Sequence, residues 1–342
     1  MDSSKLRSFL SLRFPDWSSI DVTGFRNITS GWETDVFSFD VEYAMNGVNK
    51  AERLVARVYP GSPGAYRANF EFDLLKAIHE IGFPVPRVLL VETESDTFEK
   101  PFIIMDRILG KTMREIMLEG NEARQSEMVD LFSRLFVEMH RLDWKQISMV
   151  PERYLQADPQ SLFIEHLEGL RGHISRNNVD YLVPIIDWLM ENIQNIDSLG
   201  LSLLHRDFHP MNILIDSNGK PFVIDWTAAM IGDPRIDVAW SLLLAKLHFR
   251  EGLENVFLRG YEKVLDARLK NMDFFMVDAC IRRLSDILIS LKSGPGALGM
   301  RAATADEMKT GIALLLDMHE IVENTTGLRI AEIDRQVKIL SG

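Results

Sequence analysis

The hydrophobic pattern of this chain changes once along its length, and that change constrains the fold more than any other feature. Between about residues 20 and 107 the short apolar runs alternate with polar residues or are rich in β-branched residues, as is typical of strands. One helix is predicted there, over residues 66–81, because Gly82 ends its apolar stripe. After Gly110 the spacing is helical almost to the C-terminus. The pattern predicts an α+β chain with a small β-rich lobe and a large, mainly helical lobe.

A β-rich segment at residues 203–226 interrupts the helical part. Two strand-like runs, 212–216 and 221–225, flank the turn sequence Ser217-Asn218-Gly219-Lys220, so the segment is predicted to be a hairpin. Helices are expected on both sides of it, over residues 128–142, 161–173, 184–193, 237–249, 272–291 and 305–322. A hairpin between helices is a good place to look for a functional site.

Composition narrows the class of protein. The 342 residues suffice for two domains or one two-lobed fold, and 46% hydrophobic residues are ordinary for a globular chain. Cys280 is the single cysteine, so no disulfide can form within the chain, which favours a reducing cytoplasm. The N-terminal residues lack the pattern of a secretory signal, and the longest apolar runs are too short to span a membrane. We therefore expect a cytoplasmic protein with no membrane partner.

The net charge of −12 bears on possible partners. It argues against nucleic acid, because proteins that bind the phosphate backbone without sequence preference need clustered Lys and Arg. It would favour a cationic small molecule, although many proteins are acidic for solubility alone.

Three polar residues on the predicted hairpin suit phosphoryl transfer. Asp207 and Asn212 lie on the loop that enters the first strand, and Asp225 ends the second, so antiparallel pairing is expected to bring them to one mouth. Phosphoryl transfer needs a carboxylate near the attacking hydroxyl and hard oxygen ligands for Mg²⁺. Asp207 would orient the hydroxyl and accept its proton, while Asn212 and Asp225 would hold Mg²⁺.

The longer motif resembles that of a known family. His205-Arg206-Asp207-Phe208-His209-Pro210-Met211-Asn212, followed by Val223-Ile224-Asp225-Trp226, Gly232-Asp233-Pro234 and Asp237-Val238-Ala239, is similar to the signature of the aminoglycoside phosphotransferases. These are protein-kinase-like small-molecule kinases related to choline kinases. The resemblance implies a bilobal kinase fold, ATP or GTP as phosphate donor, Mg²⁺, and a hydroxyl acceptor such as an aminoglycoside, an amino alcohol or a sugar.

The resemblance also assigns roles and lobes. It implies Asp207 as catalytic base, Asn212 and Asp225 as metal ligands, and His205 and Asp237 as structural support, although Asp237 could also be a helix N-cap. It implies a nucleotide-binding N-lobe over 1–106, a hinge at about 105–110, and a C-lobe over 111–342 that contains the catalytic hairpin and the helical acceptor-binding regions.

Further nucleotide contacts are implied in the N-lobe. Arg57 stands where kinases present a Lys to the phosphates, and Glu71 matches the helix carboxylate that pairs with that base. An ordinary edge-strand arginine and a solvated helix glutamate are the alternative. The remaining implied contacts are Ser30 and Gly31, in a hairpin over the phosphates or an ordinary turn, and Met105, Asp106 and Ile108, at the hinge. A Met at the end of an apolar strand is more often plain core, but Met105 stands before a polar hinge.

Departures from the kinase pattern argue against a protein kinase. Asp225-Trp226-Thr227 lacks the glycine of the Asp-Phe-Gly segment, and no Ala-Pro-Glu follows. Two other classes are the alternatives. A catalytically inactive nucleotide-binding protein should have lost the base or a metal ligand, and a metal-dependent hydrolase built on His205 and His209 lacks further ligands at a suitable spacing.

The acceptor itself has no readable motif. Acidic residues in the helical regions could line a pocket for an amine, or could simply lie on solvated helix faces; they are Glu165, Glu168, Asp187, Glu191, Asp273, Asp278 and Asp286. Sugars, amino alcohols and macrolides all fit the sequence.

Overall fold

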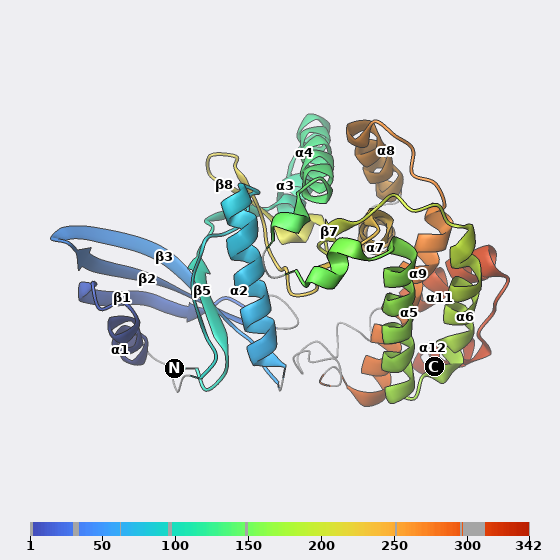
Figure 1. Cartoon of the computed structure of the whole chain (residues 1–342), viewed down its shortest axis with the longest axis horizontal. Coiled ribbons are helices and arrows are strands. Elements are labelled where there is room, and N and C mark those ends of the chain that lie inside the picture. The colour runs from blue at the N-terminus through green and yellow to red at the C-terminus, as the bar shows by residue number, and fades with distance from the viewer. Residues whose placement is uncertain are drawn as a thin grey trace. The chain divides into compact units, whose positions relative to one another are not determined.

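The structure is a computed structural model that describes residues 3–29, 34–61, 63–94, 98–147, 150–249, 252–294, 296 and 312–341. The chain forms two compact units (Figure 1). Met1–Lys111 and Leu214–Thr227 belong to the first, and Thr112–Ile213, Ala228–Leu298 and Ala302–Gly342 belong to the second.

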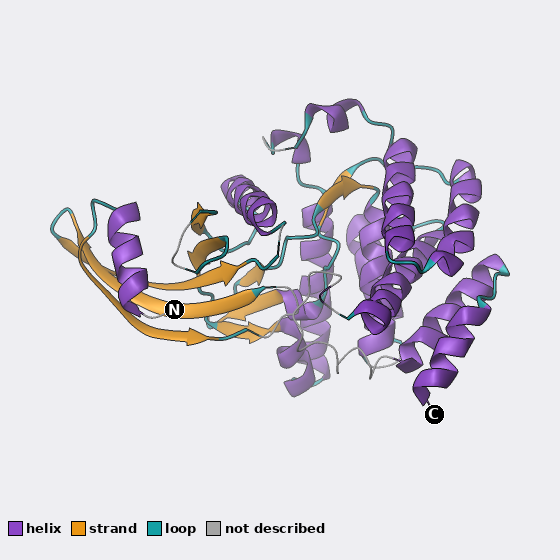
Figure 2. Ribbon diagram, turned by 90° about the horizontal axis from the view of Figure 1, so that it is seen from below, coloured by secondary structure: helices purple, strands orange, loops and turns teal. Residues whose placement is uncertain are grey.

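The first unit is built on a five-stranded antiparallel sheet with the strand order β1-β2-β3-β5-β4. Figure 2 shows its long, curved strands in orange. The strands are β1 (Ser18–Asn27), β2 (Asp35–Met45), β3 (Val48–Val58), β4 (Val88–Glu92) and β5 (Phe102–Asp106). Alternate side chains of β2 and β3, including Phe39, Val41 and Leu54, form a core with Leu6 and Leu10 of helix α1 (Ser3–Arg13). Burial of this apolar face stabilises the sheet, which no single hairpin would do alone.

The turn between β2 and β3 follows from its two residues. Asn46 and Gly47 have φ angles of 53° and 74°, and Met45 pairs directly with Val48. Two central residues with positive φ match the twist of a tight hairpin, and Asn-Gly is the pair that adopts this conformation most readily. Helix α2 (Gly64–Ile81) ends on Gly82, whose φ is 93°, as the sequence predicts.

A small sheet with the order β6-β8-β9 contains the predicted hairpin. Its strands are β6 (Gly110–Thr112), β8 (Ile213–Asp216) and β9 (Pro221–Val223). Contacts group Leu214–Thr227 with the first unit, because the Val223 N–H donates to the Pro84 carbonyl at 2.8 Å and the Trp226 N–H to Glu71 at 3.1 Å. The sequence places this hairpin in the C-lobe, and the division into functional lobes stays a prediction.

The second unit is mainly helical, as expected, and the mixed α+β class is confirmed. Its helices are α3 (Met113–Glu119), α4 (Glu122–His140), α5 (Pro159–Arg176), α6 (Val183–Asn192), α7 (Pro234–His248), α8 (Leu253–Leu265), α9 (Met272–Ser293), α11 (Ile312–Thr326) and α12 (Ala331–Ser341). Short 3₁₀ turns lie at Trp144–Gln146, Glu152–Gln156, Asp180–Leu182, Ile193–Asn195 and Pro210–Asn212. A two-stranded sheet pairs β7 (Ser202–Leu204) with β10 (Met230–Gly232).

Helix α7 begins earlier than the sequence suggests. Asp233 is its N-cap, since its side chain accepts the Arg235 N–H, and Pro234 is the first helical residue. The alternative that Asp237 is the N-cap is therefore wrong, and the Asp237 carboxylate serves other partners.

Helix α9 forms much of the core of the second unit. Cys280 lies on it with no exposed surface, and burial raises the pKa of its thiol above the ordinary value. Cys280 is thus an inert core residue. Within the described residues, no helix combines the length and apolar character needed to cross a bilayer.

Candidate active site

Three charged residues of the first unit form one ion-pair cluster. Arg57 on β3 approaches Glu71 of α2 with Nη1 at 3.2 Å from Oε1, and its Nη2 donates to Oδ1 of Asp225, which follows β9. Arg57 is 7% exposed and Glu71 is fully buried. The alternative of a solvated helix glutamate is therefore wrong.

The surroundings of Glu71 make the pairing specific. Its Oε2 accepts the Tyr59 hydroxyl, and its Oε1 also accepts the Trp226 N–H at 3.1 Å. Burial by itself would lower the pKa of Arg57, but Asp225 and Glu71 together raise it above the ordinary value. The guanidinium stays charged and links the central strand to the segment after the hairpin.

Asp225 keeps one oxygen available. Its Oδ1 accepts hydrogen bonds from Arg57 and from the Thr227 hydroxyl, the latter at 3.1 Å. Its Oδ2 accepts no hydrogen bond from the described residues, and the side chain is 34% exposed. The backbone φ of 70° is unusual for a residue other than glycine, so the surrounding contacts must hold it there.

A second cluster surrounds Asp207 in the helical unit. Asp207 Oδ1 accepts the Trp240 indole N–H at 3.0 Å, while Oδ2 accepts the Asn212 side-chain N–H at 3.0 Å and lies 3.3 Å from His209 Nε2. Burial alone would raise the pKa of Asp207, but His209, the bond from Trp240 and the more distant Arg282 lower it well below the ordinary value. Asp207 is ionised at neutral pH, and its side chain is 34% exposed.

Asp237 holds the loop on which Asp207 lies. Its carboxylate is fully buried and accepts the backbone N–H groups of His205 and Arg206, each at 2.7 Å. His205 Nδ1 in turn accepts the Asp207 N–H at 3.2 Å. His140 Nε2 lies 3.4 Å from Asp237, and its Nδ1 is 2.8 Å from the Tyr261 hydroxyl. The loop is thus fixed through its backbone.

Asn212 is oriented by its own amide. Its Nδ2 donates to the carbonyl oxygen and to the carboxylate of Asp207, at 2.9 and 3.0 Å. Its Oδ1 accepts no hydrogen bond from the described part of the chain. Magnesium prefers carboxylate and amide oxygens and usually completes its shell with water and substrate phosphates. The open oxygen of Asn212 in the second unit and that of Asp225 in the first are each of the type that Mg²⁺ binds.

The predicted hinge residues differ in whether their backbone groups are already hydrogen-bonded within the protein. Met105 is buried in β5, and the Asp106 N–H already donates to the Arg87 carbonyl at 2.9 Å. The backbone of Ile108 makes no hydrogen bond to the described residues, so its groups are available. Ser30 and Gly31 lie outside the described residues.

Reasoning from the sequence missed several residues around these clusters. Trp240 could have been found from its spacing, since residues three apart on a helix share a face, and it follows Asp237 by three positions. Tyr59 could have been found in the same way, because it follows Arg57 by two positions and residues two apart along a strand lie on the same face. Arg282, on the almost fully buried helix α9, carried none.

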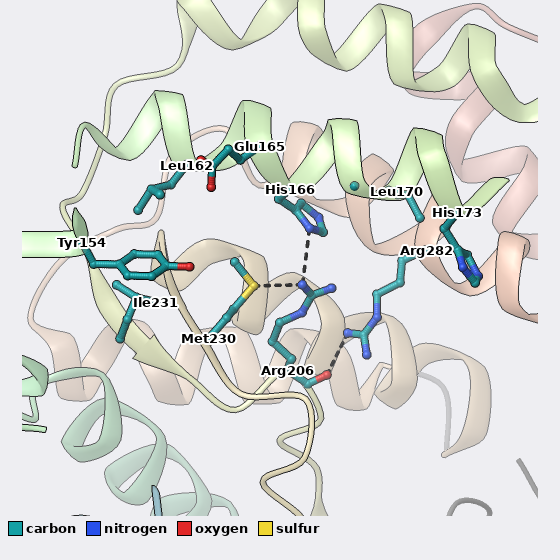
Figure 3. Close-up of a pocket in the computed structure, with 11 residues that line it drawn as sticks. Tyr154, Leu162, Glu165, His166, Leu170, His173, Arg206, Met230, Ile231 and Arg282 are labelled. Atoms are coloured by element: carbon teal, nitrogen blue, oxygen red, sulfur yellow. Dashed lines mark hydrogen bonds between the residues drawn. The ribbon is translucent and has the colours of Figure 1, made fainter. Parts of the chain in front are cut away.

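A pocket of about 450 Å³ opens beside the loop that carries Asp207, and it lies entirely within the second unit (Figure 3). Helix α5, strand β10, Arg206 and Arg282 line it. Of the seven acidic residues that the sequence suggested, Glu165 is the one among its lining residues. Asp278 instead pairs with His166 at 2.8 Å.

Within the described residues, the histidines are not arranged as a metal centre. No group of three or more His, Cys, Asp or Glu side chains is arranged to hold a metal ion in the described part of the molecule. His209 Nδ1 accepts the Met211 N–H at 3.2 Å, and His205 is committed to the loop backbone. The hydrolase alternative has no support from this geometry.

Several solved structures of aminoglycoside phosphotransferases are similar to this chain in fold. A thermostable mutant of aminoglycoside phosphotransferase APH(4)-Ia in ternary complex with AMP-PNP and hygromycin B is 19% identical, with a TM-score of 0.63 over 95% of this chain and 100% of that chain. The GDP and kanamycin complex of APH(2")-IIia is 17% identical, with a TM-score of 0.62 over 93% and 98% of the two chains. A putative aminoglycoside phosphotransferase from Ralstonia eutropha is 15% identical, with a TM-score of 0.62 over 90% and 95%. At these identities the likeness shows the fold alone.

Curated relatives include much longer proteins. The chain is 24% identical over 189 residues to acyl-CoA dehydrogenase family member 11 of Pongo abelii, matching 53% of this chain and 23% of that protein. It is 25% identical over 197 residues to family member 10 of Mus musculus, matching 56% of this chain and 18% of that protein. The chain thus spans less than a third of the length of these relatives.

The sequence agrees with the fold. Residues 24–273, more than half of the chain, match the Phosphotransferase enzyme family (APH), so the protein belongs to that family.

Proposed function

We propose that the protein transfers the γ-phosphate of ATP or GTP to a hydroxyl group of a small acceptor, with Asp207 as the base. The observation that carries the proposal is the Asp207 carboxylate itself. It is partly exposed, held ionised, and oriented by bonds from Trp240 and Asn212 on a loop that Asp237 fixes. A carboxylate held in this way can position a hydroxyl before reaction.

The residues divide the work of transfer. The acceptor oxygen forms a bond to the γ-phosphorus, the bond from that phosphorus to its bridging oxygen breaks, and a nucleoside diphosphate leaves. Asp207 holds the hydroxyl proton and accepts it as the new bond forms. Because its pKa is lowered, Asp207 is a weak base, so it acts by orientation and by taking the proton late, which suits a loose transition state.

Charge on the phosphates needs cationic partners. Arg57, fixed by Glu71, would contact them. Asn212 and Asp225 would hold Mg²⁺, which when bound neutralises charge on the phosphate oxygens. We assign Ser30, Gly31, Met105, Asp106 and Ile108 to nucleotide binding, with the free backbone of Ile108 as the best candidate for the purine edge.

The second candidate is a nucleotide-binding protein without turnover. The base and both proposed metal ligands are present in the sequence, and Asn212 Oδ1 and Asp225 Oδ2 accept no hydrogen bond from the described residues. An active kinase is therefore favoured. A cytoplasmic location, resting on the lone cysteine, is part of the same proposal.

The test is a coupled nucleotide-consumption screen over amino sugars, amino alcohols, sugars, hydroxy acids and macrolides, with MgATP and MgGTP. We expect one acceptor class to stimulate consumption. Asp207→Asn should lower kcat by at least about 100-fold with nucleotide affinity almost unchanged, which is the scale of a positioned base. Asp187→Asn, on the exposed face of α6, removes the same charge and should have no effect. Full activity of Asp207→Asn would overturn the assignment, and nucleotide binding without turnover of any acceptor would favour the second candidate.

A further inference from the structure

The pocket beside the Asp207 loop has a basic lining, although the protein is acidic. Arg206 and Arg282 extend into it side by side, and His166 and His173 face them from α5 (Figure 3). Glu165 is the acidic residue of the lining, and its carboxylate is 3.2 Å from the exposed Arg153. The lining thus carries more positive than negative charge.

Within the described residues, neither arginine forms an ion pair with a carboxylate. Among the described residues, no carboxylate oxygen lies within 4 Å of the Arg206 or Arg282 guanidinium. Arg206 Nη1 contacts Met230 Sδ at 2.9 Å and His166 Nδ1 at 3.4 Å, both weak partners for a cation. Its Nε is buried and makes no hydrogen bond. Burial and the neighbouring Arg282 lower the pKa of Arg206 to about 10.

Asp278, Asp237 and Asp286 lie near enough to raise the pKa of Arg206 in part, but among the described residues none of them forms an ion pair with either guanidinium. Asp278 is occupied by His166 at 2.8 Å. Burial raises the pKa of Asp286 above the ordinary value even though Arg282 and Arg283 oppose the shift. A bound anion would relieve the repulsion between the two guanidinium groups and satisfy their open donors.

The pocket is connected to the proposed base through two residues. Arg206 directly precedes Asp207 in the chain. Arg282 donates to the Arg206 carbonyl at 2.8 Å, and its guanidinium lies 3.7 Å from the centre of the Trp240 ring. The Trp240 indole N–H donates to Asp207. A molecule held by the arginines would therefore lie next to the group that positions the acceptor hydroxyl.

The rest of the lining is apolar. Leu162, Leu170, Met230 and Ile231 contribute to it, together with the Tyr154 ring. Small-molecule sites combine such surfaces with a few charged groups that fix orientation, in volumes of this size.

We propose that this pocket binds the acceptor and selects one that carries an anionic group, a carboxylate or a phosphate, on an apolar body. The proposal rests on the proposed kinase activity and names the substrate class. It reverses the expectation of a cationic acceptor from net charge, because the charge of the lining decides recognition and the charge of the whole surface does not.

Four six-carbon alcohols that differ in charge test it: 6-hydroxyhexanoate, 1,6-hexanediol monophosphate, 6-hydroxyhexanamide and 6-amino-1-hexanol. Binding to the full chain is measured by titration calorimetry without nucleotide, and turnover is measured with MgATP and MgGTP. We expect the carboxylate or the phosphate to bind at least about tenfold tighter than the amide, and the amine to bind weakest. The first two compounds distinguish a carboxylate site from a phosphate site.

Variants locate the site. Arg206→Gln and Arg282→Gln should each weaken anion binding about tenfold without affecting the amide, and the Lys variants should retain part of it. Arg171→Gln on α5, whose side chain pairs with Asp187, is the matched control and should change nothing. Thermal unfolding checks that each variant is folded.

The outcomes separate the two proposals. Equal binding of all four alcohols, preference for the amine, or equal loss in Arg171→Gln would overturn the anionic acceptor. Ranking by charge with no turnover of any compound would support the anion site and count against the kinase proposal. Turnover in which the amine is preferred over the anionic alcohols would support the kinase proposal and overturn the anion site.

Discussion

Asp237 accepts the backbone N–H of Arg206 at 2.7 Å, and Arg206 has a φ of 64°. A residue with a long side chain rarely adopts this left-handed conformation, so the bond from its amide helps to hold it there. The same carboxylate accepts the N–H of His205 at 2.7 Å. The geometry of the loop that carries Asp207 therefore depends on two acceptor oxygens of one buried side chain.

Asp237→Asn should weaken this support. An asparagine offers one acceptor oxygen, so one of the two N–H groups would face an NH₂ donor, at a cost of about 1–3 kcal/mol. We expect lower stability and a kcat lowered about tenfold or more, with the nucleotide KM almost unchanged. Asp233→Asn, on the same helix, is the control: stability should fall, and kcat should not. Equal losses of kcat in the two variants would show that instability alone is responsible.

Arg57→Lys tests the need for a forked cation. The guanidinium reaches Glu71 and Asp225 through different nitrogens, which a single ammonium cannot reproduce. The nucleotide KM should rise about tenfold, corresponding to about 1.4 kcal/mol. Steady-state kinetics with varied nucleotide measure it.

Arg57→Met should be much less stable, because it leaves Glu71 as an unpaired buried carboxylate, at about 3–5 kcal/mol. Adding Glu71→Gln should recover part of that loss, since Gln can still accept the Trp226 N–H. Urea denaturation of the single and double variants measures the coupling. Additive losses would mean that the pair does not interact as the structure indicates.

The Asp278–His166 pair should contribute pH-dependent stability. Burial would raise the pKa of Asp278, but His166 and the arginines near it lower it below its ordinary 3.8. Above pH 3.8 the folded state therefore gains from the ionised carboxylate, and the gain is lost as the pH falls through the lower, folded pKa. The difference in unfolding free energy between the protein and Asp278→Asn should shrink as the pH falls below 4. A difference that grows on acidification would contradict this sign.

Gly110→Ala should be strongly destabilising. An added Cβ would lie 1.9 Å from the Ile215 carbonyl oxygen and 2.6 Å from its carbon, and backbone atoms cannot move aside easily. We expect a loss of about 1–3 kcal/mol by overpacking. Gly172→Ala in α5 is the matched control, because its nearest atom is the flexible end of Arg176, and it should gain up to about 1 kcal/mol. Thermal or urea unfolding of both variants compares them, and an unperturbed Gly110→Ala would mean that β6 and β8 are farther apart.

The sequence predicts elements and short-range chemistry better than it predicts tertiary neighbours. The pairing of Arg57 with Glu71 was foreseeable, because a charged residue in an apolar strand needs a partner and the following helix offers one. The loop that carries Asp207 and Asn212 was foreseeable, because the motif from His205 to Asn212 stands directly before a strand-like run. The occupied N–H of Asp106 was not, since it depends on the position of Arg87, and neither was helix α1, whose few apolar residues give a short pattern.

The pocket shows the same limit. Helix α9 is buried on nearly every side, so no apolar stripe separates Arg282 from its neighbours in the sequence. Only the packing of α9 against the Asp207 loop brings Arg282 to Arg206 and gives the pocket its charge. Total charge could not reveal this, because it averages over the whole surface.

The buried thiol of Cys280 has a practical consequence. A cysteine that is fully covered and whose pKa is raised reacts slowly with maleimides and iodoacetamides. Since it is the one cysteine in the chain, the wild-type protein provides a low-background host for site-specific labelling. A fluorophore or spin label on a single introduced surface cysteine, in either unit, would report nucleotide and acceptor binding without any native residue being removed.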